Sequence, residues 1–513
     1  SILTIGSTFG VMGYAGFTFN SMLSAIPGIL LAICIADAIH ILMSFNLFLA
    51  EKESPKESLI HALDKNFMPT LITTLTTGFS FFSISLTEII PVKHLGLLSC
   101  FGACLAWLLS YLILGGVNSL LLKHYKNQPL KGFQKKIQMN TGYSKKLTEF
   151  LENHKKKTVV IFSLFFLISI GLSLKNEVNS DPIKYFSKSV PIRKSYDEIS
   201  KHTSGLRGAE FIVNSGKVDG IKKPEFLKKL DSFLNSLTKD PEIVSVKSIV
   251  NIIKKMNQVI NDGNEKDYKI PDSSNKVAEL LFLYTMGLPQ GMDLNNQITL
   301  DNSELRFRIL WNIETSTESE RKLKEIVKRA EDIGLNLKTG GNLPIYNQMN
   351  SLIVESFFTS VLFALIFVSF LLFLIFKDPY IAFLSLLPNV LPLTFGSALI
   401  YLRGDYLDIG TSIVTAVCLG IAVDDTIHFV ANYMRYKKDN LSIKQAIEAT
   451  LSTTGKALTA TTLLLAFGFG SFIFADFVPT QNFGILCALV LSMALIVDLI
   501  FLQALLLLAG KKK

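Results

Sequence analysis

Charge is scarce in this sequence, and cysteine is rare. Only 18% of the 513 residues are Asp, Glu, Lys or Arg, against about 25% in an average soluble protein. The five cysteines, Cys34, Cys100, Cys104, Cys418 and Cys487, all lie inside apolar stretches, so they predict no disulfide framework. With 49% hydrophobic residues, the composition excludes a disordered chain, a secreted disulfide scaffold and an ordinary cytosolic enzyme.

The sequence also lacks a cleavable signal peptide and a complete nucleotide-binding motif. It opens at Ser1 within an apolar stretch, so we expect an N-terminally truncated chain. Residues 454–457 (TGKA) resemble part of a phosphate-binding loop. However, Thr450 stands where the first glycine is required, and Ala457 stands where Ser or Thr should hold magnesium. We therefore expect no cofactor, and an ion gradient as the energy source.

Long apolar blocks dominate the chain instead. A block of about 18 or more apolar residues predicts a membrane-spanning helix. The first block is shorter than a full span, and we expect it to be the end of a helix. The blocks lie at 1–16, 22–46, 67–87, 92–122, 158–174, 352–376, 380–402, 409–434, 456–475 and 483–509. The sequence therefore predicts a polytopic α-helical membrane protein.

Residues 175–350 interrupt this pattern with a charged segment of mixed sign. Within it, 208–215 and 304–313 predict strands. Residues 223–239 and 316–333 predict amphipathic helices, the second capped by its own first residue. The alternation predicts a compact inserted α+β domain, either of α/β type or with a split βαβ topology.

Positive charge is concentrated in residues 123–157, which contain ten Lys and two Glu. Lys and Arg gather on the cytoplasmic side of membrane proteins, so we predict a basic cytoplasmic linker rather than a nucleic-acid site. If every block spans, the basic loop 435–444 and Lys511–Lys513 lie on the same side. Residues 175–350 are then predicted to be extracytoplasmic, as in a periplasm.

The chain contains an internal repeat. A shift of 388 residues lays 1–122 on 389–510 without a gap. The identical pairs include Gly16/Gly404, Asp37/Asp425, His40/His428, Thr73/Thr461, Thr74/Thr462, Pro91/Pro479 and Gly96/Gly484. Apolar composition alone does not readily align Asp, His, Pro and Gly. We therefore predict a pseudo-two-fold repeat of a six-helix unit, with a counterpart of residues 157–388 expected before Ser1.

Two predicted spans carry ionisable residues near their middles. The first contains Asp37 and His40, and the second contains Asp424, Asp425 and His428. A charged residue in hydrocarbon costs at least about 2.5–3.5 kcal/mol, so these side chains should face the bundle interior or a water-filled cavity. An Asp and a His three residues apart share one helix face. The repeat predicts that both sets meet near the pseudo-axis, where they suit a proton relay.

The alternative to a proton relay is an inert hydrogen-bond network, in which the histidines only orient the aspartates. Two threonines on the next span of each repeat could donate hydrogen bonds to the acids, or could bond only to their own backbone. They are Thr73, Thr74, Thr461 and Thr462. Asp498 is a further acid in mid-span, and its role is left open.

Residues 420–428 (GIAVDDTIH), with the duplicated six-helix unit and the inserted domain, resemble the RND superfamily of exporters. The likeness is greatest to the MmpL- and Patched-like branch. In these proteins the five-helix part is also called a sterol-sensing domain. The first copy resembles the motif less, because Ala32 and Ala36 stand where Gly420 and Asp424 stand in the second copy.

The resemblance implies an RND fold with five parts. These are a first transmembrane repeat at 1–122, the linker at 123–157, a seventh helix at 158–174, a porter domain at 175–350 and a second transmembrane repeat at 351–510. It also implies a multi-pass protein of the cytoplasmic (inner) membrane. There, the intramembrane acids would couple inward proton flow to the export of lipids or other hydrophobic molecules. By the motif match those acids are Asp37, Asp424 and Asp425.

Three other classes are weighed against this exporter. One is an accessory of protein export like the SecD/SecF branch, and another is a sterol- or lipid-sensing protein without transport. The third is a metal-dependent membrane enzyme with Asp37, His40, Asp425 and His428 as ligands; the repeat symmetry favours a relay, so we expect neither an enzyme nor a metal. The expected partners are protons, the membrane and a hydrophobic or lipidic substrate, with no nucleic acid. A homo-oligomer is left open.

Overall fold

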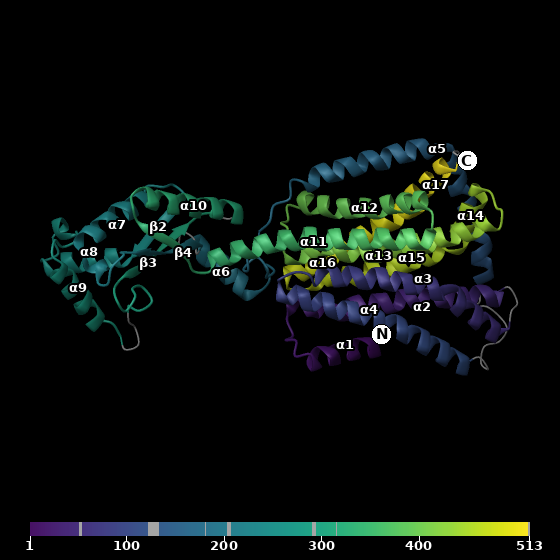
Figure 1. Cartoon of the computed structure of the whole chain (residues 1–513), viewed down its shortest axis with the longest axis horizontal. Coiled ribbons are helices and arrows are strands. Elements are labelled where there is room, and N and C mark those ends of the chain that lie inside the picture. The colour runs from purple at the N-terminus through teal and green to yellow at the C-terminus, as the bar shows by residue number, and fades with distance from the viewer. Residues whose placement is uncertain are drawn as a thin grey trace. The chain divides into compact units, whose positions relative to one another are not determined.

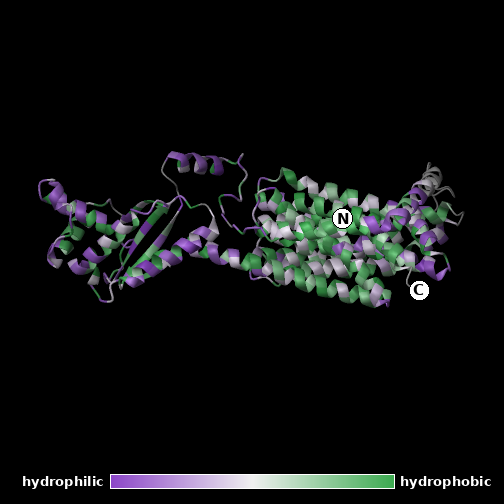
Figure 2. Cartoon of the chain, turned by 90° about the horizontal axis from the view of Figure 1, so that it is seen from above, coloured by the Kyte–Doolittle hydropathy of each residue, from purple (hydrophilic) through white to green (hydrophobic). Residues whose placement is uncertain are grey.

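The computed structural model describes residues 1–50, 54–121, 133–179, 181–202, 207–289, 294–313 and 315–510 (Figure 1). The chain divides into two compact units. One comprises Ser1–Val178 and Leu352–Lys513, and the other comprises Asn179–Ser351. The first unit is helical and rich in apolar residues, whereas the second mixes polar and apolar residues around a small sheet (Figure 2).

Nine helical segments among the described residues are long and apolar enough to cross a membrane. They are Ser21–Ala50, Pro55–Ile84, Ile90–Gly116, Gly142–Ser173, Leu343–Phe376, Pro379–Leu402, Ile409–Lys438, Gly455–Phe474 and Val478–Ala509. The first apolar block forms only the short helix α1 (Ile2–Tyr14). Every apolar block thus corresponds to an apolar helix, and the predicted polytopic helical membrane protein is confirmed.

The helices of the first repeat are α1, α2 (Ile26–Ala50), α3 (Pro55–Ile84) and α4 (Ile90–Leu121). Those of the second are α11 (Leu343–Phe376), which begins just before the repeat, α12 (Pro379–Leu402), α13 (Ile409–Lys438), α14 (Ile443–Thr453), α15 (Gly455–Gly470), α16 (Val478–Ile496) and α17 (Gln503–Ala509). The remaining long helix is α5 (Phe133–Ser173). Capping boxes fix three helix starts among the described residues. The pairs are Ser54 with Glu57 at α3, Asp408 with Thr411 at α13 and Ser442 with Gln445 at α14.

The two repeats pack on each other through equivalent positions. Helix α3 contacts α13, and in the matching contact α15 contacts α2. A Cβ added to Gly420 would lie 2.6 Å from Ser80 Cβ, and one added to Gly468 would lie 3.7 Å from Ala32 Cβ. Gly420 and Ala32 are repeat mates, as are Ser80 and Gly468. The contacts therefore have the pseudo-two-fold relation that the sequence predicts.

The second repeat differs from the first in helix continuity. Helix α3 is unbroken, whereas its counterpart is interrupted at Thr454 between α14 and α15. Helix α4 is also continuous, but its counterpart contains a π-helical turn, Val497–Leu502, between α16 and α17. Glycine has low helix propensity, and Gly455 directly follows the first interruption. Turns of π-helix are frequent at functional sites, and this one carries Asp498.

The repeat-conserved glycines Gly96 and Gly484 sit at close helix crossings. A Cβ at Gly96 would lie 2.6 Å from the carbonyl oxygen of Phe81, and a Cβ at Gly484 would lie 2.4 Å from that of Phe469. Phe81 and Phe469 are themselves repeat mates. Glycine therefore lets α4 approach the backbone of α3, and lets α16 approach that of α15, at the same place in both halves.

Replacing Gly484 with Ala should lower thermal stability, because an added methyl group forces packed helices apart and costs about 1–3 kcal/mol. The measurement is the unfolding temperature of the full-length protein in detergent. Gly470→Ala is the control, since its nearest neighbour would be Ala488 Cβ at 3.9 Å, an ordinary contact. Equal unfolding temperatures for the two variants would contradict this account.

The second unit contains a four-stranded sheet in the order β2-β3-β1-β4. Its strands are β1 (Gly208–Asn214), β2 (Ile243–Ser248), β3 (Glu304–Trp311) and β4 (Asn336–Gly340). All neighbouring pairs are antiparallel. Strand β3 lies between β1 and β2, and β1 lies between β3 and β4, so each strand–helix–strand unit is split. The split βαβ topology is confirmed over the α/β-type alternative.

One face of this sheet forms the core, because β1 and β3 alternate buried and partly exposed residues. Phe211 and Phe307 stack within the core at 5.2 Å between ring centroids. The surrounding helices are α6 (Pro191–His202), α7 (Pro224–Leu237), α8 (Ile249–Ile260), α9 (Ser274–Met286) and α10 (Ser316–Asp332). The predicted cap of α10 was wrong by one residue. Thr315 caps the helix, and its hydroxyl accepts the Glu318 N–H.

Candidate functional site

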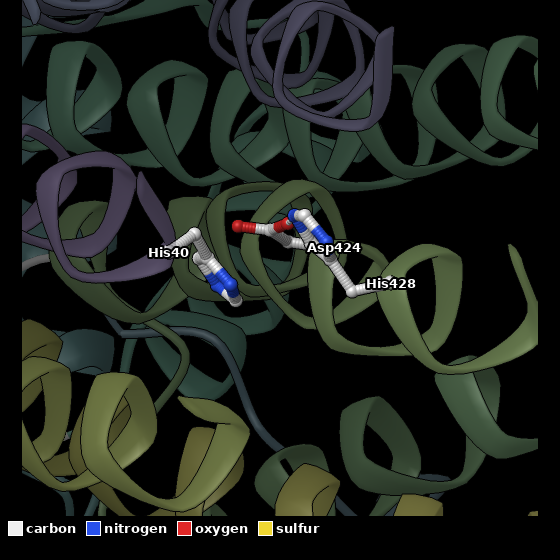
Figure 3. A group of neighbouring side chains, drawn as sticks. All are labelled: His40, Asp424 and His428. Carbon is white, nitrogen blue, oxygen red and sulfur yellow. Dashed lines mark ion pairs between the residues drawn. The ribbon is translucent and has the colours of Figure 1, made fainter. Parts of the chain in front are cut away.

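Helices α2 and α13 bring the predicted acids and histidines together inside the helical unit. Asp37, His40, Asp425 and His428 are all buried, with at most 8% of each residue exposed. The rings of His40 and His428 stack in parallel, with 4.1 Å between centroids and 3° between planes. Figure 3 shows Asp424 beside this pair. Equivalent residues of the two repeats therefore meet in the bundle interior.

The pairing within α13 differs from the expected one. His428 Nε2 lies 3.3 Å from Asp424 Oδ1, four residues earlier, without the alignment of a hydrogen bond. The shared helix face that the sequence predicts for Asp425 and His428 thus does not make them partners, because the carboxylate nearest to His428 is four residues earlier and not three. Asp425 instead faces α15, where its Oδ2 accepts a hydrogen bond from Thr462 Oγ1 at 2.8 Å. Neighbouring helix positions point about 100° apart, so the two acids serve different contacts.

The four predicted threonines divide by environment. Thr462 donates to Asp425, whereas Thr461 donates to the carbonyls of Ala457 and Leu458 on its own helix. Thr73 donates to the Thr70 carbonyl at 3.0 Å, and its side chain also lies against Asp424. Thr74 lines a small cavity that Asp37 and Asp424 also line. Three of the four threonines thus lie beside an acid.

Two polar cavities adjoin the cluster. The first has a volume of about 20 Å³ and lies between Asp37 and Asp424, which is enough for one water molecule. The second, of about 80 Å³, is lined by His40, His428 and the lysines Lys65 and Lys456, among other residues. Because Asp424 lies beside His428, the cluster connects the two cavities.

Several buried polar atoms in the cluster have no hydrogen-bond partner within the described part of the chain. They include Asp37 Oδ2 and His40 Nε2, together with Asp424 Oδ1 and His428 Nε2. Buried polar groups are nearly always satisfied by protein or by ordered water. The arrangement therefore suits bound water and exchangeable protons better than a closed hydrogen-bond network.

A second polar network surrounds Asp498, which is 2% exposed. Thr426 Oγ1 donates to Asp498 Oδ1 at 2.8 Å, and Asn389 Nδ2 lies 3.1 Å from the same hydroxyl oxygen. Sequence reasoning missed Asn389 and Thr426. The only local signals were a polar residue between Pro388 and Pro392 and a Thr directly after Asp425. The network joins α12, α13 and the π-helical turn. In the first repeat, Ala38 stands at the position of Thr426, and Ser110 stands at the position of Asp498.

The cluster does not fit a metal ion as it is arranged. Ligand atoms of His40, Asp424 and His428 lie within 4.8 Å of one another, so distance alone does not exclude a shared metal, and the orientation of the rings decides. An imidazole nitrogen binds a metal in the plane of its ring. Since the two rings are parallel and stacked, a metal in one plane lies well outside the other.

The fold and the cluster define a class, namely a multi-pass membrane protein built from two equivalent helix bundles with acids buried where the bundles meet. Comparison with known families gives the particular family. Residues 301–513 match the MMPL family, and residues 1–120 match the Patched SSD family. The two matches lie on the two transmembrane repeats and support the resemblance to MmpL- and Patched-like proteins that the sequence motif predicted.

Named relatives support the same assignment. The membrane protein MJ1562 of Methanocaldococcus jannaschii is 24% identical over 376 residues, which is 70% of this chain and 92% of that protein. The MmpL3 proteins of Mycobacterium leprae and Mycolicibacterium smegmatis, named as trehalose monomycolate exporters, are 32% and 31% identical over 83 and 86 residues. These two matches cover 16% of this chain and only 9% and 8% of the MmpL3 proteins.

Proposed function

We propose that this protein is a proton-driven transporter that exports lipids or other hydrophobic molecules from the cytoplasmic (inner) membrane. One observation carries the proposal. Carboxylates from both repeats, Asp37 and Asp424, border one water-sized cavity inside the bundle, next to the stacked pair His40 and His428. In this proposal Asp37, Asp424 and Asp425 carry the protons, and the histidines connect them to the larger cavity.

Protonation can drive a conformational change here because charge inside the bundle is costly. A buried carboxylate gains or loses a full charge when its proton leaves or arrives, and the surrounding helices must accommodate that charge. Helices α2 and α13 carry the acids, while α3 and α15 pack across the repeat boundary. Two packings of these helices, favoured by different protonation states, would alternate as protons enter and leave.

Charge distribution and relatives support the proposed direction and cargo. Lys and Arg gather in 123–157 and 435–444, which favours a cytoplasmic position for both and an extracytoplasmic position for residues 175–350. The MmpL3 relatives are named as trehalose monomycolate exporters. Trehalose monomycolate is a glycolipid, and we extend only this class of cargo, a lipid, to this chain. We propose a transporter rather than an enzyme, with protons, the membrane and a lipidic substrate as partners.

The decisive experiment is proton uptake by the purified protein in liposomes. A pH-sensitive dye inside the vesicles should report acidification when the outer buffer is made acidic, and mass spectrometry of the co-purified lipids should supply the candidate cargo. Faster uptake than in protein-free vesicles is expected. Uptake equal to that of protein-free vesicles with every candidate cargo would instead favour a lipid-sensing protein without transport.

Thr462→Val should slow this uptake about tenfold, because it removes the hydrogen bond to Asp425, and bonds to charged groups contribute about 1.5–3 kcal/mol. Thr461→Val is a matched control on the adjacent residue. Both threonines are nearly fully buried, but Thr461 donates only to its own helix. Equal slowing in both variants would show that buried threonines matter for packing and not for the acid.

A further inference from the structure

The second unit contains a cavity of about 270 Å³ that the proton relay does not use. Its wall comes from the segment before α6, the start of β1, the end of β3, the N-terminal turn of α10 and the start of α11. Part of its floor is the sheet face that the hydrophobic core leaves uncovered. There, Glu210 of β1 lies between Arg308 of β3 and Gly340 of β4 in register.

The cavity is lined by two carboxylates and two guanidinium groups. Asp181 pairs with Arg207, and Glu210 pairs at 3.2 Å with Arg306, which does not line the cavity. Both carboxylates thus have an ion-pair partner. The guanidinium of Arg308 has no hydrogen bond or ion pair with any residue that the structure describes. Arg308 is therefore the positive group at the cavity wall that is left for a ligand.

A buried amide adds a hydrogen-bond donor without an acceptor. Asn179 is 6% exposed, and its Oδ1 accepts a hydrogen bond from Ser316 Oγ at 2.9 Å. Its Nδ2 is buried and has no hydrogen-bond partner among the residues that the structure describes. An unpaired buried donor costs about 1–3 kcal/mol, and Asn179 lines the cavity, so an acceptor bound there would offset this cost.

The N-terminus of α10 reinforces this donor surface. Thr315, Ser316 and Ser319 line the cavity, and the helix continues for 17 residues to Asp332. The first turn of a helix presents unsatisfied N–H groups and a partial positive charge. Such a terminus binds phosphate and carboxylate readily.

We propose that this cavity binds a phosphate group, held by Arg308, Asn179 and the N-terminal turn of α10. Tyr196, Trp311 and Tyr346 also line the cavity and contact the group to which the phosphate is attached. The same chemistry is offered by the headgroup of an anionic phospholipid and by a soluble phosphate. The site needs no proton flow, so its failure would leave the proposed transport intact, and failure of transport would leave the site intact.

Tryptophan fluorescence gives a direct test, because the chain has two tryptophans and one of them, Trp311, lines the cavity. In full-length protein with Trp107→Phe, Trp311 is the sole reporter. It is titrated with sodium phosphate at constant ionic strength, with dihexanoyl phosphatidic acid, and with zwitterionic dihexanoyl phosphatidylcholine as the reference. Saturable quenching is expected for at least one of the first two and not for the third.

Arg308→Gln should weaken this binding at least about tenfold, because it removes the uncompensated charge-assisted contact. Asn179→Asp should weaken it similarly by placing a carboxylate against the phosphate. Arg321→Gln removes the same charge from an exposed position on α10 that pairs with Glu242, and it should bind as the parent does. Unchanged urea unfolding of each variant, followed through Trp311, shows that the fold is retained.

The outcomes separate the sources of the phosphate. Saturation by phosphatidic acid alone assigns the site to a lipid headgroup, and saturation by inorganic phosphate at similar concentrations assigns it to a soluble phosphate. The proposal is overturned if neither probe saturates, if phosphatidylcholine quenches equally, or if Arg308→Gln binds like Arg321→Gln.

Discussion

Asp425→Asn is expected to reduce proton uptake to the rate of protein-free liposomes. The amide has nearly the same shape as the carboxylate, and its oxygen can still accept the Thr462 hydrogen bond. It cannot exchange a proton, however, and loss of a positioned proton-transfer group costs roughly 100-fold or more. Because Asp425 is 8% exposed and lies among apolar helices, a neutral side chain should leave folding and insertion intact.

Asp424→Asn should have the same effect, since Asp424 shares the water-sized cavity with Asp37 and lies beside His428. Asp378→Asn is the matched control. Asp378 caps α12 by accepting the N–H groups of Tyr380 and Ile381, and Asn caps helices as well as Asp does. Normal uptake by Asp425→Asn or Asp424→Asn, in protein that is folded and inserted, would remove the basis for a proton-driven mechanism.

The approach of the two histidines could be predicted because two regularities coincide. The 388-residue shift aligns His40 with His428 and Asp37 with Asp425, and a pseudo-symmetric bundle places such positions near its axis. Ionisable residues also avoid lipid, which fixes the face that each helix turns inward. No information about individual side-chain rotamers is needed for this inference.

The partners of each acid could not be predicted in the same way. Positions three and four residues apart both share a helix face, so the pattern does not distinguish Asp425 from Asp424 as the neighbour of His428. The contact of Thr426 with Asn389 and Asp498 joins side chains of three helical segments that are 37 and 72 residues apart in the chain. It also depends on a π-helical turn that has no counterpart in the first repeat, where α4 continues unbroken.

In the second unit, the long strands were easier to find than the short ones. Strands β1 and β3 alternate apolar and polar residues over seven and eight positions. Strands β2 and β4 are shorter, and they form the two edges of the sheet. Edge strands often carry polar residues, so their sequences lack the periodic signal on which strand prediction relies.

Lys322→Met is expected to destabilise the second unit by about 2 kcal/mol, because it removes buried hydrogen bonds to two carboxylates, and bonds to charged groups contribute about 1.5–3 kcal/mol. Arg329, 3.7 Å from Asp240, remains as a weaker ion-pair partner. The Lys322 side chain is 4% exposed, and its Nζ lies 2.6 Å from Asp240 and 2.9 Å from Glu242. Asp240 is itself 11% exposed. Urea unfolding of the full-length protein, followed through Trp311 in a Trp107→Phe background, measures the change.

Lys324→Met is the control, since Lys324 pairs with Glu320 on the exposed side of the same helix. Such surface pairs contribute about 0–1 kcal/mol, so the control should unfold near the parent's urea concentration. If Lys322→Met unfolds at the same urea concentration as Lys324→Met, the buried cluster does not hold the domain together.

The pH dependence of unfolding gives an independent check on the same cluster. Burial opposes ionisation of Asp240, but hydrogen bonds from Lys322 and the Glu242 backbone outweigh it and lower the pKa of Asp240. A carboxyl group with a lowered pKa stabilises the fold above its unfolded-state pKa, and this contribution is lost as pH falls through the folded-state value. The parent protein should therefore lose stability on acidification, whereas Lys322→Met, without the main cause of the lowered pKa, should lose less. The difference between the two proteins should be largest near neutral pH and should shrink towards pH ~3. An equal difference at both pH values would mean that Lys322 stabilises the domain through packing of its aliphatic chain and not through Asp240.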